Sequence, residues 1–184
     1  MTEDLLALDH RTGLPDALRV LLETYPREGW TQHRNFAGLV EFWLGRHMMF
    51  RQLTGALQED AEQAMDGKMD LMLYKPRLAR FGGGLVQELH GHHNIEDHHY
   101  FPQLSGLEPS LQRGFDILDK DHHAMDGLLS RFANAANGVL QDTSEIGVFR
   151  EELLSFNKML DRHLVDEEEL IVPVILKNGS DVLH

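Results

Sequence analysis

Two stretches of the sequence decide its fold, HHNIEDHHYFP at residues 92–102 and HLVDEEELIVP at residues 163–173. Each begins with a histidine, has acids four and five residues later, and has a proline ten residues later. A weaker likeness relates HMMFR at residues 47–51 to HHAMD at residues 122–126. The repetition indicates two helical hairpins of similar design.

Around these stretches, apolar residues recur at the three- and four-residue steps of a helix, and no segment alternates like a strand. The expected helical segments cover residues 31–66, 68–81, 84–104, 109–137 and 143–177. Gly82, Gly83 and Gly84 should separate the second segment from the third. Four long helices with short connections favour an all-α fold, an antiparallel up-down four-helix bundle.

The first thirty residues differ from the rest. Pro15 and Pro26 enclose a short amphipathic stretch, which predicts a helix over about residues 14–25. We therefore expect residues 1–30 to be a short helical extension packed on the bundle, and residues 31–184 to be the bundle itself.

Each expected long helix carries a histidine in the middle of its apolar stripe. These residues are His47, His92, His122 and His163. A polar group inside a bundle costs free energy unless it is paired or bound to a metal. One such histidine would need no special explanation, but four of them, one on each helix, need a common cause.

Hairpin geometry predicts that the four histidines share one layer. Residues equidistant from a tight turn lie at the same level of two antiparallel helices, because each residue rises about 1.5 Å. The midpoint between His92 and His122 falls at residue 107, inside an expected turn. The midpoint between His122 and His163 also falls in an expected connection, and that between His47 and His92 falls just after Gly67.

Two glutamates extend this layer. Glu96 follows His92 by four residues, and Glu167 follows His163 by four, so each pair lies on one helix face. A glutamate can bridge two metal ions while histidines cap them, as in other bundle cores. Imidazole with carboxylate and no thiolate suits iron or manganese, and also zinc.

The repeated HxxxE motif with its proline, and the single histidine on each of the other two helices, resemble the hemerythrin-like (HHE cation-binding) family over about residues 31–176. The resemblance implies an antiparallel four-helix bundle with two iron ions, joined by an oxo or hydroxo bridge. In that family the centre serves oxygen binding, sensing or iron handling. The implied ligands are His47, His92, Glu96, His122, His163 and Glu167.

The sequence departs from the oxygen-carrying members at one position. Their third ligand helix has two histidines four residues apart, whereas Asp126 stands four residues after His122 here. Six ligands are therefore clear, and a seventh remains open. The candidates, in order of preference, are His93, Asp126 and Glu168.

Composition excludes several classes of protein. The formal net charge is −13 with scattered basic residues, so we expect no nucleic-acid partner. The absence of cysteine excludes disulfides, thiolate zinc sites and iron–sulfur clusters. The acidic N-terminus is unlike a signal peptide and no apolar run is long enough for a bilayer, so a cytoplasmic protein without a membrane partner is expected. The oligomeric state stays open.

Three functions fit this centre. The first is a di-iron protein that binds or senses oxygen, nitric oxide or iron without turnover. The second is a di-iron enzyme, such as an oxidase, a peroxidase or an iron–sulfur cluster repair factor, although no separate catalytic motif accompanies the ligands. The third is a structural bundle held by zinc.

Overall fold

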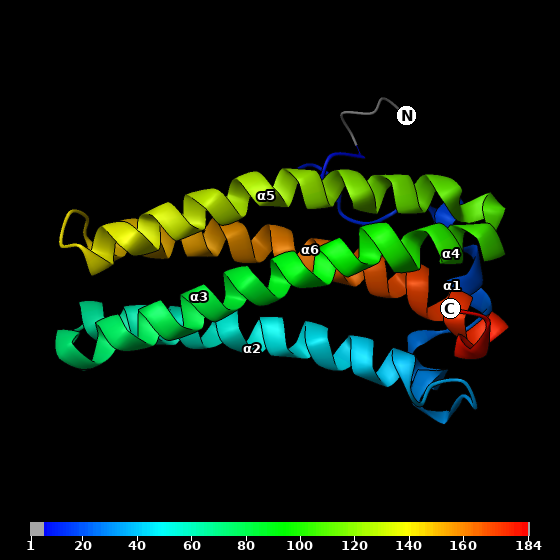
Figure 1. Cartoon of the computed structure of the whole chain (residues 1–184), viewed down its shortest axis with the longest axis horizontal. Coiled ribbons are helices and arrows are strands. Elements are labelled where there is room, and N and C mark those ends of the chain that lie inside the picture. The colour runs from blue at the N-terminus through cyan, green and yellow to red at the C-terminus, as the bar shows by residue number, and fades with distance from the viewer. Residues whose placement is uncertain (1–5, 184) are drawn as a thin grey trace. The chain divides into compact units, whose positions relative to one another are not determined.

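The computed structural model describes residues 6–183, which form helices and connections without a strand. Its α-helices are α1 (Val20–Thr24), α2 (Leu39–Met65), α3 (Leu71–Ile95), α4 (Phe101–Leu107), α5 (Gln112–Leu140) and α6 (Ile146–Asn178) (Figure 1). Shorter 3-10 turns cover Asp16–Leu18, Arg27–Gln32, Pro109–Leu111 and Ser180–Val182. No helix in this part of the chain has both the length and the apolar character of a transmembrane span. The all-helical architecture agrees with the expected fold class.

The chain divides into two compact units, and each of the four long helices contributes to both. The first unit contains the described residues up to His47, residues 93–123, and those from Asp161 onward. The second contains residues 48–92 and 124–160. Of the six predicted ligands, only His92 belongs to the second unit.

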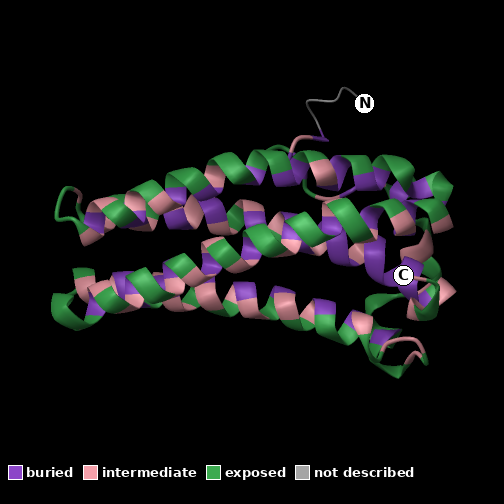
Figure 2. Cartoon of the chain, in the orientation of Figure 1, coloured by how far each residue is buried: buried purple, intermediate pink, exposed green. Residues whose placement is uncertain are grey.

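The first unit is built around the C-terminal half of α6. Nearly every residue from His163 to Leu176 is buried, so this part of α6 is covered on all sides (Figure 2). Residues from the N-terminal segment help to cover it, because Leu14, Leu18 and Trp30 belong to the same apolar core. The chain before α2 is therefore part of the packing that surrounds the predicted ligands.

The second unit has its own aromatic core. The ring of Phe132 packs against Phe149 and Phe156, with centroids 5.4 and 5.5 Å apart. The expected helix break at residues 82–84 is wrong, because α3 runs through the three glycines. A Cβ on Gly82 would lie 3.7 Å from the Phe132 ring, an ordinary van der Waals contact, and Gly83 and Gly84 have no atom within 4 Å of an added Cβ. The three glycines therefore cost the helix roughly 1 kcal/mol each without breaking it.

The N-terminal part of the chain is less helical than the sequence predicts. Instead of one helix over residues 14–25, a 3-10 turn at Asp16–Leu18 precedes the five-residue α1. The helix expected from residue 31 begins only at Leu39. Gly38 has a φ of +84°, a left-handed conformation outside the helical range, and it fixes this later start.

A π-helical turn at Glu96–Tyr100 interrupts the expected helix between α3 and α4. The backbone N–H of Phe101 donates to the carbonyl of Glu96, five residues earlier. The wider turn shifts the buried face, so Phe101 and Leu104 point into the core while His99 is exposed. In an uninterrupted α-helix His99, three residues after Glu96, would instead share its buried face. Such turns often occur at functional sites, and this one begins at a predicted ligand.

Candidate metal centre

Six buried side chains of the first unit bring their nitrogen and oxygen atoms together in two groups. The first group consists of His93, His122 and His163. The second includes His47, Glu96 and Glu167. Within each group the ligand atoms lie within 4.8 Å of one another. Five of the six predicted ligands are therefore brought together here, and His93 joins them.

The two glutamates of the second group also approach histidines of the first group. One carboxylate oxygen of Glu167 is 3.5 Å from Nε2 of His47, and the other is 3.4 Å from Nε2 of His163. An oxygen of Glu96 lies 3.6 Å from Nε2 of His122. A carboxylate whose two oxygens face different histidines is placed to share two cations.

Three of the histidines have a carboxylate at Nδ1, the ring nitrogen that does not face the other ligand atoms. The pairs are His47 with Glu168 at 3.0 Å, His122 with Asp97 at 2.6 Å, and His163 with Asp121 at 3.1 Å. In each pair Nδ1 faces the carboxylate, while Nε2 faces the cluster. A proton on Nδ1 leaves Nε2 as the ligand atom, and the carboxylate fixes the ring orientation. This arrangement is typical of histidines that bind metals.

The carboxylates also alter the pKa values of the histidines. Burial lowers the pKa of His163, but hydrogen bonds and charges of Asp121 and Glu167 outweigh it and raise this pKa to about 9. The pKa of His47 is raised in the same way, since Glu167 and Glu168 outweigh its burial. A cation that binds Nε2 must therefore displace a proton from His163 at neutral pH.

The pKa of Glu96 is raised well above its usual range. Burial is the largest cause, followed by the neighbouring carboxylate of Glu167. Trp43 on α2 donates its indole N–H to Glu167 at 2.7 Å and so holds that carboxylate in place. A cation would favour the ionised form of both glutamates, because its charge reverses the repulsion between them. The donor set and its charge thus fit a metal site.

His92, the remaining predicted ligand, is the last residue of α3 in the second unit. Its ring is half-buried and packs against Phe50, with centroids 5.3 Å apart. Its role as a ligand stays a prediction.

The three candidates for a seventh ligand have different surroundings. His93 is buried, and its ring stacks on His122 with centroids 3.9 Å apart. Glu168 is buried as well, but its oxygens face Nδ1 of His47 and the side chain of Arg27. Asp126 is exposed, with an oxygen 3.8 Å from His90. The surroundings favour His93.

Several residues that orient the predicted ligands were not predicted from the sequence. Asp97 and Asp121 hold Nδ1 of two histidines, yet they lie 25 and 42 residues from them. Arg11, which binds Asp121, is farther still from its partner. No local spacing rule connects such pairs. The one usable signal was that Asp97 follows Glu96 in the repeated motif.

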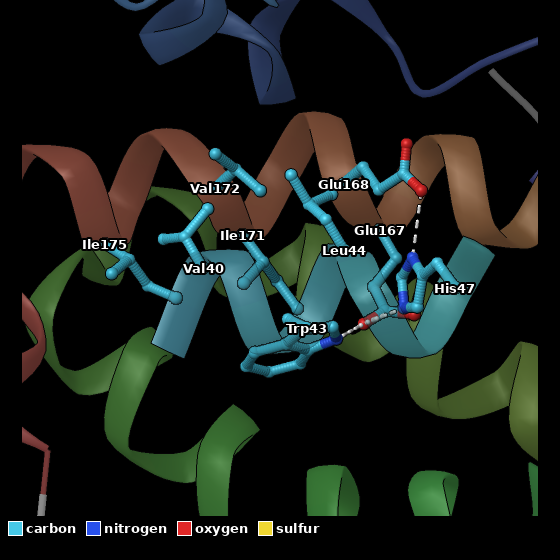
Figure 3. Close-up of a pocket in the computed structure, with 9 residues that line it drawn as sticks. All are labelled: Val40, Trp43, Leu44, His47, Glu167, Glu168, Ile171, Val172 and Ile175. Carbon is cyan, nitrogen blue, oxygen red and sulfur yellow. Dashed lines mark hydrogen bonds and ion pairs between the residues drawn. The ribbon is translucent and has the colours of Figure 1, made fainter. Parts of the chain in front are cut away.

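An apolar pocket adjoins the centre between α2 and α6 (Figure 3). His47 and Glu167 stand at one end, where the indole of Trp43 meets the carboxylate. The lining residues are Val40, Trp43, Leu44, His47, Glu167, Glu168, Ile171, Val172 and Ile175. Its cavity volume is only about 10 Å³, so it is a small apolar gap beside the centre.

Buried imidazoles and carboxylates that converge from the helices of an all-α chain define a cation-binding helical protein. The family model described as hemerythrin HHE cation binding domain matches residues 38–175. The match spans well over half of the chain, so the chain belongs to this family. No curated protein and no solved structure shows significant similarity to it. The residues before α2 that contact the site lie outside the matched region.

Proposed function

We propose that the chain is a non-haem di-iron protein whose centre binds oxygen or nitric oxide without catalytic turnover. The observation that carries this proposal is the position of Glu167. Its two oxygens face Nε2 atoms of different histidines, 3.5 and 3.4 Å away. A single cation would not require histidines on both sides of one carboxylate.

The proposed ligands divide between the two ions. His93, His122 and His163 hold one ion, while His47 and His92 hold the other. Glu96 and Glu167 are shared. His93 is the seventh ligand of this proposal, because it is the candidate that is both buried and grouped with two other histidines. It stands in for the second histidine that the oxygen carriers have on the helix of His122.

The proposal also includes the topology of the bundle and the bounds of its domains. The four long helices form an antiparallel bundle, with the histidines in one layer. Residues 1–30 are an extension, and residues 31–184 form the metal-binding domain. The continuous helices α2, α3, α5 and α6, each carrying at least one predicted ligand, support this arrangement.

Bound iron supplies open coordination positions and a change of oxidation state. The side chains of the protein would exclude water, line a pocket and orient the ligands. The proposed ligands other than the half-buried His92 are buried, so bulk water is kept from them. The small pocket beside His47 and Glu167 has mostly aliphatic walls, which favours O₂ or NO over a polar or larger substrate. Outer carboxylates keep Nε2 of three histidines turned inward.

The test is anaerobic loading of the full chain with ferrous iron, followed by metal analysis and titration with NO or O₂. We expect two irons per chain, new near-ultraviolet and visible absorption after exposure to the gas, and no turnover. Glu167→Gln should lower the iron content and remove the spectral change. Glu62→Gln, which alters a half-exposed carboxylate bound to Arg150, is the matched control. Zinc alone, or iron without a spectral response, would contradict the proposal.

A further inference from the structure

Arg11, in the N-terminal segment, is buried in the first unit, with a side chain only 1% exposed. Its Nε donates to Asp166 at 2.7 Å, and its Nη1 donates to Asp121 at 2.8 Å. Its Nη2 also donates to Asp121. A buried guanidinium is costly unless charged partners satisfy it, so this pairing is specific.

Asp121 connects Arg11 to the metal centre. The carboxylate that receives two hydrogen bonds from Arg11 also holds Nδ1 of His163, at 3.1 Å. Arg11 therefore fixes the orientation of the group that orients His163.

A second arginine of the same segment repeats the pattern. Nη1 of Arg27 donates to one oxygen of Glu168 at 2.7 Å. The other oxygen of Glu168 lies 3.0 Å from Nδ1 of His47. Arg27 is 43% exposed, and its guanidinium stacks over Trp30 at 4.6 Å from the ring centroid. The two arginines thus reach one histidine in each of the two ligand groups.

We propose that the N-terminal segment sets the properties of the metal centre, with Arg11 and Arg27 as positioning residues that act through Asp121 and Glu168. The inference rests on the proposed function only in taking His163 and His47 as metal ligands. Loss of either arginine removes a charged partner from a buried carboxylate. That carboxylate can then turn, and its histidine loses the fixed ring orientation.

Arg19 provides a matched control on the same segment. It contacts Glu169 at 3.3 Å and Asp16 at 2.8 Å. Neither carboxylate is hydrogen-bonded to a histidine of the centre. Arg19→Gln therefore removes an arginine that contacts α6 without touching a group that orients a ligand.

The experiment uses the full chain loaded with Co²⁺, whose visible spectrum reports the coordination of the site. Affinity is measured by competition with a chelator for Arg11→Gln, Arg27→Gln and Arg19→Gln. We expect Arg11→Gln to weaken Co²⁺ binding by about tenfold or more, the lower end of the effect of outer-sphere partners. Arg27→Gln should have a smaller effect because the side chain is partly exposed. Both should shift the Co²⁺ bands, whereas Arg19→Gln should match the unaltered chain.

Rescue distinguishes positioning from general destabilisation. Arg11→Lys keeps the charge but replaces three donor nitrogens in a fixed plane by one, so it should recover part of the affinity. Equal affinities and spectra for the folded Arg11→Gln and Arg19→Gln variants would overturn the inference. If Arg11→Gln does not fold, Arg27→Gln decides, and a spectrum identical to that of Arg19→Gln overturns the inference. Failure of the unaltered chain to take up two irons contradicts the proposed function alone, because these measurements need only Co²⁺ at His47 and His163.

Discussion

Asp121→Asn should both weaken metal binding and destabilise the folded chain. Asp121 is buried, accepts two hydrogen bonds from Arg11, and holds Nδ1 of His163. Asparagine has nearly the same shape but no charge, and its NH₂ group turns one acceptor into a donor. That donor must face either the guanidinium or the Nδ1–H, neither of which can accept a hydrogen bond.

The size of each effect follows from these contacts. Removing one partner of a buried ion pair costs about 3–5 kcal/mol, and Arg11 keeps Asp166 as a second partner, so we expect about 3 kcal/mol. In a domain of this size that loss lowers Tm by roughly 6–12 °C. Loss of the carboxylate at Nδ1 should reduce metal affinity about 10- to 100-fold.

Urea unfolding of the metal-free chain measures the first effect, and chelator competition measures the second. Asp119→Asn is the matched control, because Asp119 lies two residues before Asp121 on α5 and its side chain is 50% exposed. A change of less than about 0.5 kcal/mol in Asp121→Asn, together with unaltered metal affinity, would refute the reasoning.

Three further predictions concern packing, pH and metal removal. Gly114→Ala should destabilise the chain by about 1–3 kcal/mol in urea, because its Cβ would lie 2.8 Å from a methyl group of buried Leu170. Gly127→Ala, with no atom within 4 Å of the added methyl, should instead be neutral or stabilising. Metal uptake at pH 7 should release at least one proton, measurable in weakly buffered solution, because the pKa of His163 is raised to about 9. The apparent metal affinity should therefore rise with pH until the pKa of His163 is passed. An affinity that does not depend on pH would contradict this prediction. Removal of the metal by a chelator should lower Tm, since a ligand at 100 times its Kd stabilises the native state by about 2.7 kcal/mol.

Helical periodicity and the repeated motif were sufficient to predict the helices and most of the candidate site. The stripes on α2, α5 and α6 placed His47, His122 and His163 inward, and all three are buried. Chain connectivity alone predicted one layer of four histidines, and three of them, His47, His122 and His163, lie in the ligand groups of the first unit. Such patterns are informative because burial of an apolar face determines which side chains point inward.

The errors came from features that local patterns do not encode. Three consecutive glycines predict a break, but α3 continues through them. The π turn at Glu96–Tyr100 adds a residue to the helical turn, which the helical periodicity of the sequence does not predict and which leaves His99 exposed. The arginine contacts of the N-terminal segment join residues more than 100 positions apart, so no periodicity in the sequence could predict them.

Anomalous scattering at the iron edge from crystals of the iron-loaded chain tests the di-iron assignment most directly. We expect two iron peaks that share the carboxylates of Glu96 and Glu167. One should be coordinated by Nε2 of His47 and the other by Nε2 of His163. A single peak, or peaks that leave either histidine uncoordinated, would contradict the di-iron assignment.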